Sequence, residues 1–242
     1  MILREITTII ILAGMLISSI FAGSLTGRVN FEGKGPKKKT LKMDADPVCG
    51  SSHKETTVHN QNFIINEDGF LKNVMIYLKD VKYDEKAPET QAVLNQVGCM
   101  YSPHVQGMMV GQDLLIKNSD ATLHNIHGLS KVNPEFNFAM PKVVKEKAIS
   151  INKPEHPISI KCDVHPWMKS YVSVFDHPFF AVTNDTGHYK IDNIPPGEYE
   201  VIAWQEKFKD KKTKEWKTLS ASVTINGSET AQNFTFIRPA TK

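Results

Sequence analysis

The sequence predicts an all-β protein built from β-sandwich units. Short runs in which apolar and polar residues alternate recur along the chain, and turn strings such as NEDG, NDTG and PPGE separate them. The expected strands are residues 25–31, 73–79, 113–118, 158–162, 171–175, 188–191, 198–204 and 221–225. No long stretch repeats apolar residues with a period of about 3.6, and only residues 86–97 are expected to form a short helix. Many short strands with few helices are typical of sandwich folds.

Length, composition and charge limit how many cores the chain can form and which partners it can bind. The chain has 242 residues, of which 40% are hydrophobic and 23% charged, so it can bury one large core or two modest ones. Its net charge of +3 is too small to predict a nucleic-acid partner. Lysines cluster at residues 33–42 and 207–217, and both stretches are expected to be solvated loops.

The N-terminus has the layout of a secretory signal peptide. Residues 1–23 hold one basic residue, Arg4, then an apolar run, and small residues follow at 22–24. The run is nearly long enough to span a bilayer, so an uncleaved N-terminal anchor is the alternative. No other segment has that length, and the mature chain is expected to have no membrane span. We therefore expect a periplasmic or secreted protein.

Three cysteines occur in the chain, at positions 49, 99 and 162. An odd count in an oxidising compartment leaves one free thiol or one metal ligand beside a disulfide. Cys162 stands among other soft ligands, so the natural partition pairs Cys49 with Cys99. The sequence permits this disulfide without establishing it, because connectivity depends on geometry.

The string CDVHPWM, residues 162–168, brings a thiolate, an imidazole and a thioether within seven residues. Alternation along the preceding strand puts Cys162 on the same face as two isoleucines, at the core end of that strand. Upstream, the strand at 113–118 is followed by a turn and then His124. A thiolate, two imidazoles and a weak axial thioether form the ligand set of a blue-copper site.

Together these two segments resemble the cupredoxin (blue-copper) family, most of all its amicyanin and plastocyanin members. Those proteins carry a strand ending in Asn, a turn, a His-Asn step, and a Cys-x-x-His loop closed by Met. The resemblance implies a Greek-key β-sandwich that holds one type 1 copper. It implies as ligands His124, Cys162, His165 and Met168. His127 lies three residues after His124 and is the alternative imidazole.

Residues 183–204 and 218–236 resemble the carboxypeptidase regulatory-like family of small transthyretin-like β-sandwiches. The opening strands of that family have their counterparts far upstream, at residues 25–36 and 69–81. This arrangement predicts a small sandwich interrupted by the cupredoxin unit. The expected divisions are 1–23 signal peptide or anchor, 24–83 first part of the small sandwich, 84–178 cupredoxin domain, 179–238 second part, and 239–242 tail. The alternative is two consecutive domains, with residues 24–178 as one enlarged unit.

The ligand set predicts an electron carrier and not an enzyme, because the protein fills every coordination position. Oxygen-reducing copper clusters need further imidazoles, and the sequence contains no H-x-H string. The main alternative is a copper-handling protein that stores or delivers the ion; a metal-free cupredoxin-like fold is another. Residues 99–111 could then form a second soft-metal site, with Cys99, Met100, His104, Met108 and Met109 as candidates.

The expected partner is a redox protein, a cytochrome or a dehydrogenase. Electron exchange is expected at the edge where His165 meets solvent, next to the apolar Pro166 and Trp167. The lysine-rich loops are assigned to the small sandwich and are expected to steer an acidic partner without approaching the metal.

Overall fold

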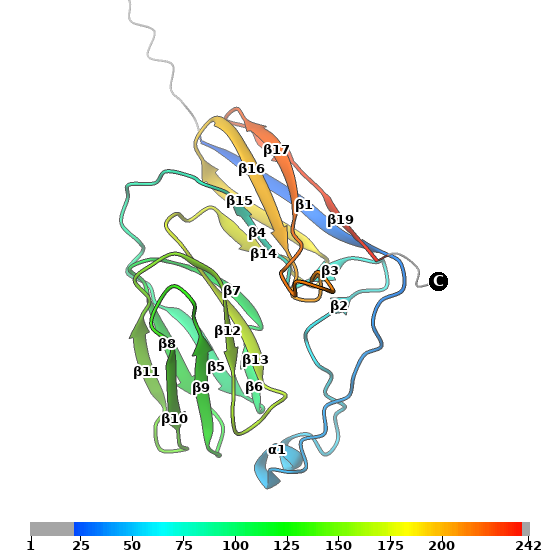
Figure 1. Ribbon diagram of the computed structural model, residues 1–242, viewed down its shortest axis with the longest axis vertical. Helices are drawn as coiled ribbons and strands as arrows, with labels where there is room; N and C mark the ends of the chain where they lie inside the picture. The colour runs from blue at the N-terminus through cyan, green and yellow to red at the C-terminus, as the bar shows by residue number, and fades with distance from the viewer. Residues whose placement is uncertain (1–21, 239–242) are drawn as a thin grey trace, which may run out of the picture.

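The computed structural model describes residues 22–238, so nearly all of the predicted signal or anchor and the whole predicted tail lie outside the described residues. The described chain is nearly all β and forms two sandwich bodies, one above the other in Figure 1. Its one helix is short, α1 (Pro47–Ser52). Between residues 22 and 238, no helix has both the length and the apolar character needed to cross a bilayer. The all-β prediction is confirmed.

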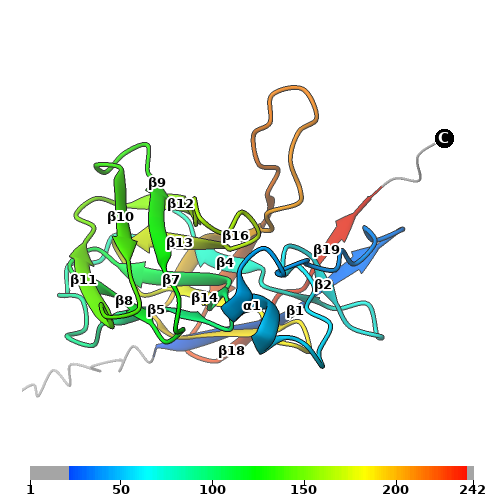
Figure 2. The same ribbon diagram turned by 90° about the horizontal axis from the view of Figure 1, so that it is seen from below.

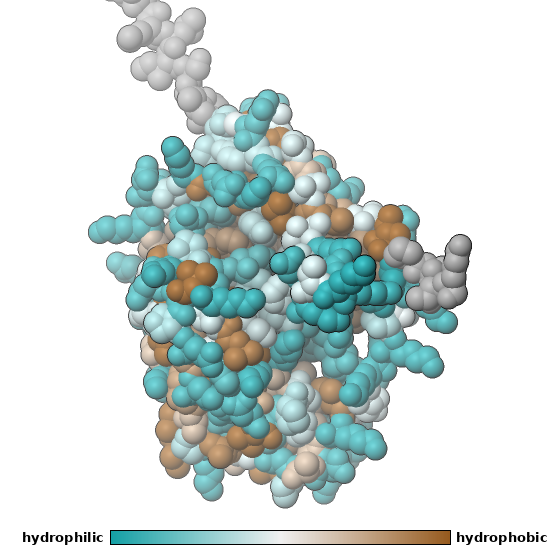
Figure 3. All heavy atoms as spheres, viewed as in Figure 1, coloured by the Kyte–Doolittle hydropathy of each residue, from teal (hydrophilic) through white to brown (hydrophobic). Residues whose placement is uncertain are grey.

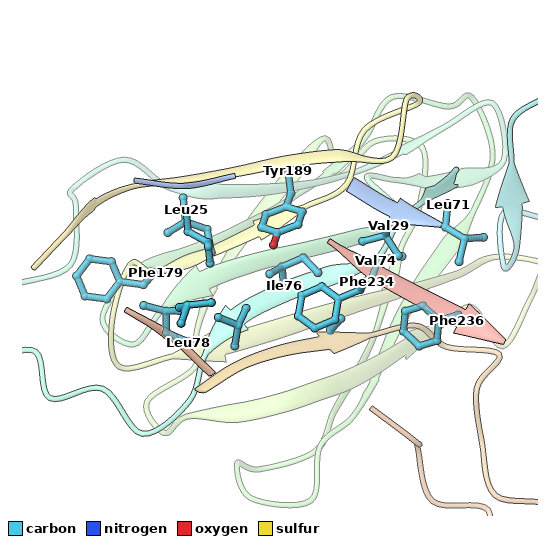
Figure 4. Packing of buried hydrophobic residues seen from close by; sticks show 14 of the residues in the cluster. Leu25, Val29, Leu71, Val74, Ile76, Leu78, Phe179, Tyr189, Phe234 and Phe236 are labelled. Atoms are coloured by element: carbon cyan, nitrogen blue, oxygen red, sulfur yellow. The ribbon is translucent and has the colours of Figure 1, made fainter. Parts of the chain in front are cut away.

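The first sandwich joins both ends of the described chain. One of its sheets contains β1 (Gly23–Glu32), β15 (His188–Ile194), β18 (Glu229–Ala231) and β19 (Phe234–Ile237). The other contains β4 (Met75–Leu78), β14 (Phe180–Val182), β16 (Gly197–Trp204) and β17 (Leu219–Ile225). Strand β1 pairs antiparallel with β15 and parallel with β18 and β19. Side chains from the early strands, such as Leu25 and Ile76, therefore share one core with Tyr189 and Phe236 from the late ones (Figure 4).

The second sandwich is made from the middle of the chain. One sheet has the order β10 (Phe136–Met140), β9 (His124–Leu129), β12 (Glu155–Lys161), β13 (Lys169–Phe175), β7 (Val105–Met109). The facing sheet has the order β11 (Glu146–Ser150), β8 (Asp113–Asn118), β5 (Ala92–Val97), β6 (Met100–Ser102). Its core contains Ile116, Ile126, Ile158 and Ile160. Alternating side chains on each strand supply that core, which is what a two-sheet sandwich requires.

A long excursion separates β1 from the short hairpin of β2 (Ile64–Ile65) and β3 (Leu71–Lys72). We call residues 33–62 the cap segment. It leaves the first sandwich, carries α1 at its tip beside the second sandwich, and returns (Figures 1 and 2). Its two arms are held together by backbone hydrogen bonds, from Leu41 N to the Val58 carbonyl at 2.9 Å and from Asn60 N to the Lys39 carbonyl at 3.0 Å. The sequence prediction had grouped these residues with the first sandwich only.

All of the predicted strands are present, but the predicted helix at 86–97 is wrong. Residues Ala92–Val97 form β5, which pairs in parallel with β8. Leu94 and Gln96 are buried whereas Val93 and Val97 are exposed, which is the period of two of a strand. The segment has only a weak helical propensity, so packing against the sandwich core decides its conformation. The domain boundaries stay a prediction.

The surface agrees with this division between cores and exterior. On the face shown in Figure 3, hydrophilic residues predominate and apolar residues occur in small scattered groups. Scattered exposed apolar residues are ordinary for a folded protein, so the large apolar side chains are accounted for mainly by the two cores.

Candidate metal centre

The four predicted ligands come from neighbouring strands of one sheet. His124 is the first residue of β9, Cys162 directly follows β12, and Met168 directly precedes β13. These strands are adjacent in the order β9, β12, β13, and β9 pairs antiparallel with β12. The start of β9 and the loop after β12 therefore lie at the same end of the sheet.

Three donor atoms converge there. The Nδ1 atoms of His124 and His165 are 2.9 Å apart, and Cys162 Sγ lies 3.9 Å from His165 Nδ1. The donor atoms of these three residues all lie within 4.8 Å of one another. Relative exposures are 0% for His124, 2% for Cys162, 2% for His165 and 0% for Met168, so the cluster is sealed from solvent.

The loop from Cys162 to Met168 is closed by its own backbone. Cys162 N donates to the Met168 carbonyl at 3.3 Å, and Met168 N donates to the His165 carbonyl at 2.9 Å. The His165 N–H also points at the Cys162 sulfur, at 3.3 Å. These bonds fold the loop back on itself, which explains how residues so close in sequence can present their side chains to one point.

His124 is positioned by the turn before it. The side chain of Asn118, the last residue of β8, donates to the carbonyls of Thr122 at 3.1 Å and Met140 at 2.8 Å. Its Oδ1 accepts from Asp120 N at 3.1 Å, a short-range bond typical of Asx turns. Asn118 therefore fixes the path of the chain into β9.

The outer ring nitrogen, Nε2, of each imidazole faces a carboxylate. His124 Nε2 lies 2.8 Å from Asp120 Oδ2, and His165 Nε2 lies 3.2 Å from Asp46 Oδ2. Asp46 is also the N-cap of α1, and accepts from Val48 N at 2.8 Å. A carboxylate on the outer nitrogen fixes the ring orientation and keeps that proton in place, which is the usual arrangement around metal-binding histidines.

Protonation follows from these contacts. Burial acts to raise the pKa of Asp46, but hydrogen bonds from Cys49 N, Thr122 and His165 outweigh it and lower the pKa to about 2. Burial lowers the pKa of His165, so this ring is neutral, with its proton on Nε2 facing the ionised Asp46. Its Nδ1 is then a bare acceptor pointing at His124.

His124 and Cys162 each favour the charged form of the other. Burial acts to lower the pKa of His124, but hydrogen bonds to Asp120 and Cys162 raise it to about 9. Burial likewise acts to raise the pKa of the Cys162 thiol, and the bonds from His124 and from backbone N–H groups lower it. The lowered pKa of Cys162 favours its thiolate form, and its sulfur and the Nδ1 of His165 are both directed at the same point.

The residues present fit a copper ion. One soft sulfur and two imidazole nitrogens are the donors that copper sites of the blue type use, and the buried thioether of Met168 belongs to the same loop. Two ring nitrogens 2.9 Å apart can stay that close when a proton or a metal cation lies between them. The cluster is therefore suited to hold a small soft cation.

The expectation that His165 meets solvent is wrong. Its ring is covered by the cap segment, with Cys49 Sγ 3.8 Å from its Nε2. Cys49 is bonded to Cys99 in a disulfide with a Cα–Cα distance of 5.6 Å, which ties the cap to the start of β6. Asp46 and Cys49 lie more than 100 positions before His165 in the chain, so no local pattern in the ligand loop predicts this cover.

Three further histidines lie outside the cluster. The two ring nitrogens of His127 pair with Asp163 at 2.8 Å and Glu135 at 2.7 Å. His53 Nε2 bonds to the Gly98 carbonyl at 2.7 Å, while His59 is exposed.

The second soft-metal site proposed within residues 99–111 does not assemble. Cys99 is in the disulfide, and Met108 packs in the core of the second sandwich. His104 Nδ1 lies 3.0 Å from the Lys169 carbonyl, and its other ring nitrogen contacts Glu206. These residues therefore have separate structural roles.

Sequence reasoning missed the two carboxylates. Asp120 stands four residues before His124, a spacing that hinted at contact within one tight turn. Asp46 precedes Pro47, which is a signal for a helix start, since Asp favours the N-cap and Pro the first helical position. That signal locates α1 but says nothing about His165.

Comparisons with known proteins give partial structural likenesses. No protein-family model matches the chain, and no curated protein matches it. A copper-containing nitrite reductase from Thermus scotoductus is 24% identical over 40% of this chain and only 25% of its own, with a TM-score of 0.32. An amicyanin variant in the Cu(I) state is 17% identical over 41% of this chain and 97% of its own, with a TM-score of 0.32. A purple cupredoxin from Nitrosopumilus maritimus is 20% identical over 35% of this chain and 99% of its own, with a TM-score of 0.30. The likeness concerns part of the chain only, so the candidate metal centre is judged on its own geometry.

Proposed function

We propose that His124, Cys162, His165 and Met168 hold one copper ion and that the protein is an electron carrier outside the cytoplasm. The observation that carries this proposal is the pair of Nδ1 atoms 2.9 Å apart beside the Cys162 sulfur, each outer nitrogen being held by a carboxylate. Copper supplies a one-electron couple in such a ligand set.

The residues around the cluster suit that task. Asp120 and Asp46 hold the two imidazoles in place, and the loop hydrogen bonds hold the sulfur of Cys162. Rigid donors change little when one electron is gained or lost. Burial of all four side chains excludes water and leaves no open position for a substrate, which favours a carrier over an enzyme.

The copper-handling alternative has less support. A protein that delivers an ion must expose it, whereas the cap segment covers His165 and is tied down by the Cys49–Cys99 disulfide. The disulfide also favours an oxidising compartment, in line with the predicted signal peptide. The redox partner, which we take to be another protein such as a cytochrome or dehydrogenase, is part of this proposal.

The test is spectroscopic. The copper-loaded protein is expected to bind one ion with intense visible thiolate-to-Cu(II) absorption, and Cys162→Ser is expected to abolish the colour. His124→Ala should lose most of the affinity, and Met168→Leu should keep the metal and change the reduction potential. His127→Ala is the matched control and should leave absorption and electron paramagnetic resonance unchanged. A colourless Cu(II) complex would refute the blue-copper assignment.

A further inference from the structure

A groove of about 540 Å³ opens beside the ligand loop. Residues 39–42 and 60–62 of the cap segment line it together with Met100, Pro166 and Trp167. It therefore lies where the cap segment meets the second sandwich. The predicted electron-exchange edge includes Pro166 and Trp167, but it does not include the cap residues and lysines that form the rest of this groove.

Trp167 connects the groove with the buried cluster. Its ring centroid lies 5.0 Å from that of His165, at an interplanar angle of 41°. Its indole N–H donates to the Cys99 carbonyl at 3.0 Å, which fixes the ring. Since His165 is only 2% exposed, it reaches the outside through partly exposed neighbours, Trp167 and Asp46. Of these two, Trp167 is the one that lines the groove.

Four lysines give the groove a strong positive charge. Lys39, Lys42, Lys169 and Lys207 all line it, and three of them, all except Lys169, are exposed. The chain as a whole has a net charge of only +3, so this density of ammonium groups is local. Residues at one end of each lysine-rich stretch thus border the groove beside the ligand loop.

One carboxylate in the groove, Glu206, does not cancel this charge at the rim. It is 6% exposed and turns inward, where it contacts the His104 ring and accepts from Tyr171 Oη at 3.0 Å. Lys169 Nζ lies 3.9 Å from it. The exposed lysines therefore face solvent, and within residues 22–238 none of them forms an ion pair with a carboxylate.

We propose that this groove docks an acidic loop of the redox partner, and that the Trp167 ring is the contact between that loop and His165. The inference rests on the proposed function. Carboxylates of the loop complement the lysines, and its apolar atoms meet Met100, Pro166 and Trp167. A volume of about 540 Å³ suits a few protein side chains, and the small net charge disfavours a nucleic acid as the occupant.

The first experiment needs no copper. Hexacyanochromate(III), a paramagnetic and redox-inert trianion, is added to the full mature chain, and amide signals are followed by nuclear magnetic resonance. Signals of Leu41, Asn62 and Trp167 should broaden first. The double variant Lys42→Glu, Lys207→Glu should reduce the broadening several-fold. The double variant Lys82→Glu, Lys86→Glu, at two exposed lysines outside the groove, is the charge-matched control and should leave the broadening unchanged. Broadening centred on another face, or equal in both variants, overturns the proposal.

The second experiment uses the copper-loaded protein and hexacyanoferrate(II), which loses one electron to the oxidised protein and becomes hexacyanoferrate(III). At low salt, the double lysine variant should react about tenfold more slowly, and the difference should shrink as salt is added. Trp167→Leu should slow the reaction at every salt concentration while hexacyanochromate(III) still binds, and Trp167→Phe should recover part of the rate. Rates indifferent to all three variants overturn the proposal. Failure to take up copper instead refutes the proposed function and leaves the docking result of the first experiment standing.

Discussion

His156 should make the protein acid-sensitive, and the effect can be sized from its surroundings. This residue of β12 lies at the junction of the two sandwiches, with ring centroids 4.9 Å from Tyr77, 5.7 Å from Phe175 and 5.3 Å from Trp204. Its Nδ1 lies 2.7 Å from Ser173 Oγ, and its Nε2 is buried with no hydrogen-bond partner among residues 22–238. Burial lowers the pKa of His156 from 6.5 to about 3.

The direction of the pH effect follows from that shift. In the unfolded chain His156 takes up a proton near pH 6.5, whereas in the folded protein it stays neutral until pH 3 is approached. The folded state is therefore penalised as the pH falls below 6.5, and no penalty is present above it. Between pH 6.5 and pH 5, a difference of about 1.5 pH units corresponds to about 2 kcal/mol of unfolding free energy.

The assay compares wild type with His156→Phe by urea unfolding of the metal-free protein at several values between pH 7.5 and pH 5. At pH 7.5 the variant should be about 1 kcal/mol less stable, because Ser173 loses a hydrogen-bond partner. By pH 5 the order should reverse, since the Phe ring keeps the aromatic packing and carries no proton. His59→Phe, which removes an exposed imidazole, should track wild type. Parallel curves for wild type and His156→Phe, within about 0.5 kcal/mol, would refute the reasoning.

Two further predictions concern stability. Glu155 is 9% exposed and accepts from Ser130 Oγ and from Lys131 N, so Glu155→Gln should cost about 2 kcal/mol in urea unfolding at pH 7. Burial acts to raise the pKa of Glu155, but these bonds lower it below 4.5, so the gap between variant and wild type should close as pH falls through that lowered value. Replacing Cys49 and Cys99 together by Ala removes a crosslink over 50 positions, for which chain entropy gives about 4 kcal/mol, and an unchanged urea midpoint would contradict that estimate.

The sequence by itself determined the strands and the composition of the candidate site. Alternation with a period of two predicts β1 and β8 because each of these strands buries one face, and that property is local. The short segment 86–97 was misjudged because apolar residues too few for a clear period leave helix and strand undecided until a partner strand, here β8, is present. Cys162, His165 and Met168 could be grouped because one loop carries them all.

Tertiary structure alone decided what surrounds those ligands. Asp46 and Cys49 reach His165 from more than 100 residues away, along a cap segment whose path depends on its packing against Cys99 and Met100. The same path buries the imidazole expected at the surface and builds the groove beside Trp167. A segment of this length can follow many paths that differ little in local conformational free energy. Loop-closure entropy does not select one of them, because it varies only slowly with length. The choice among them is made by contacts between distant residues, which spacing along the chain does not encode.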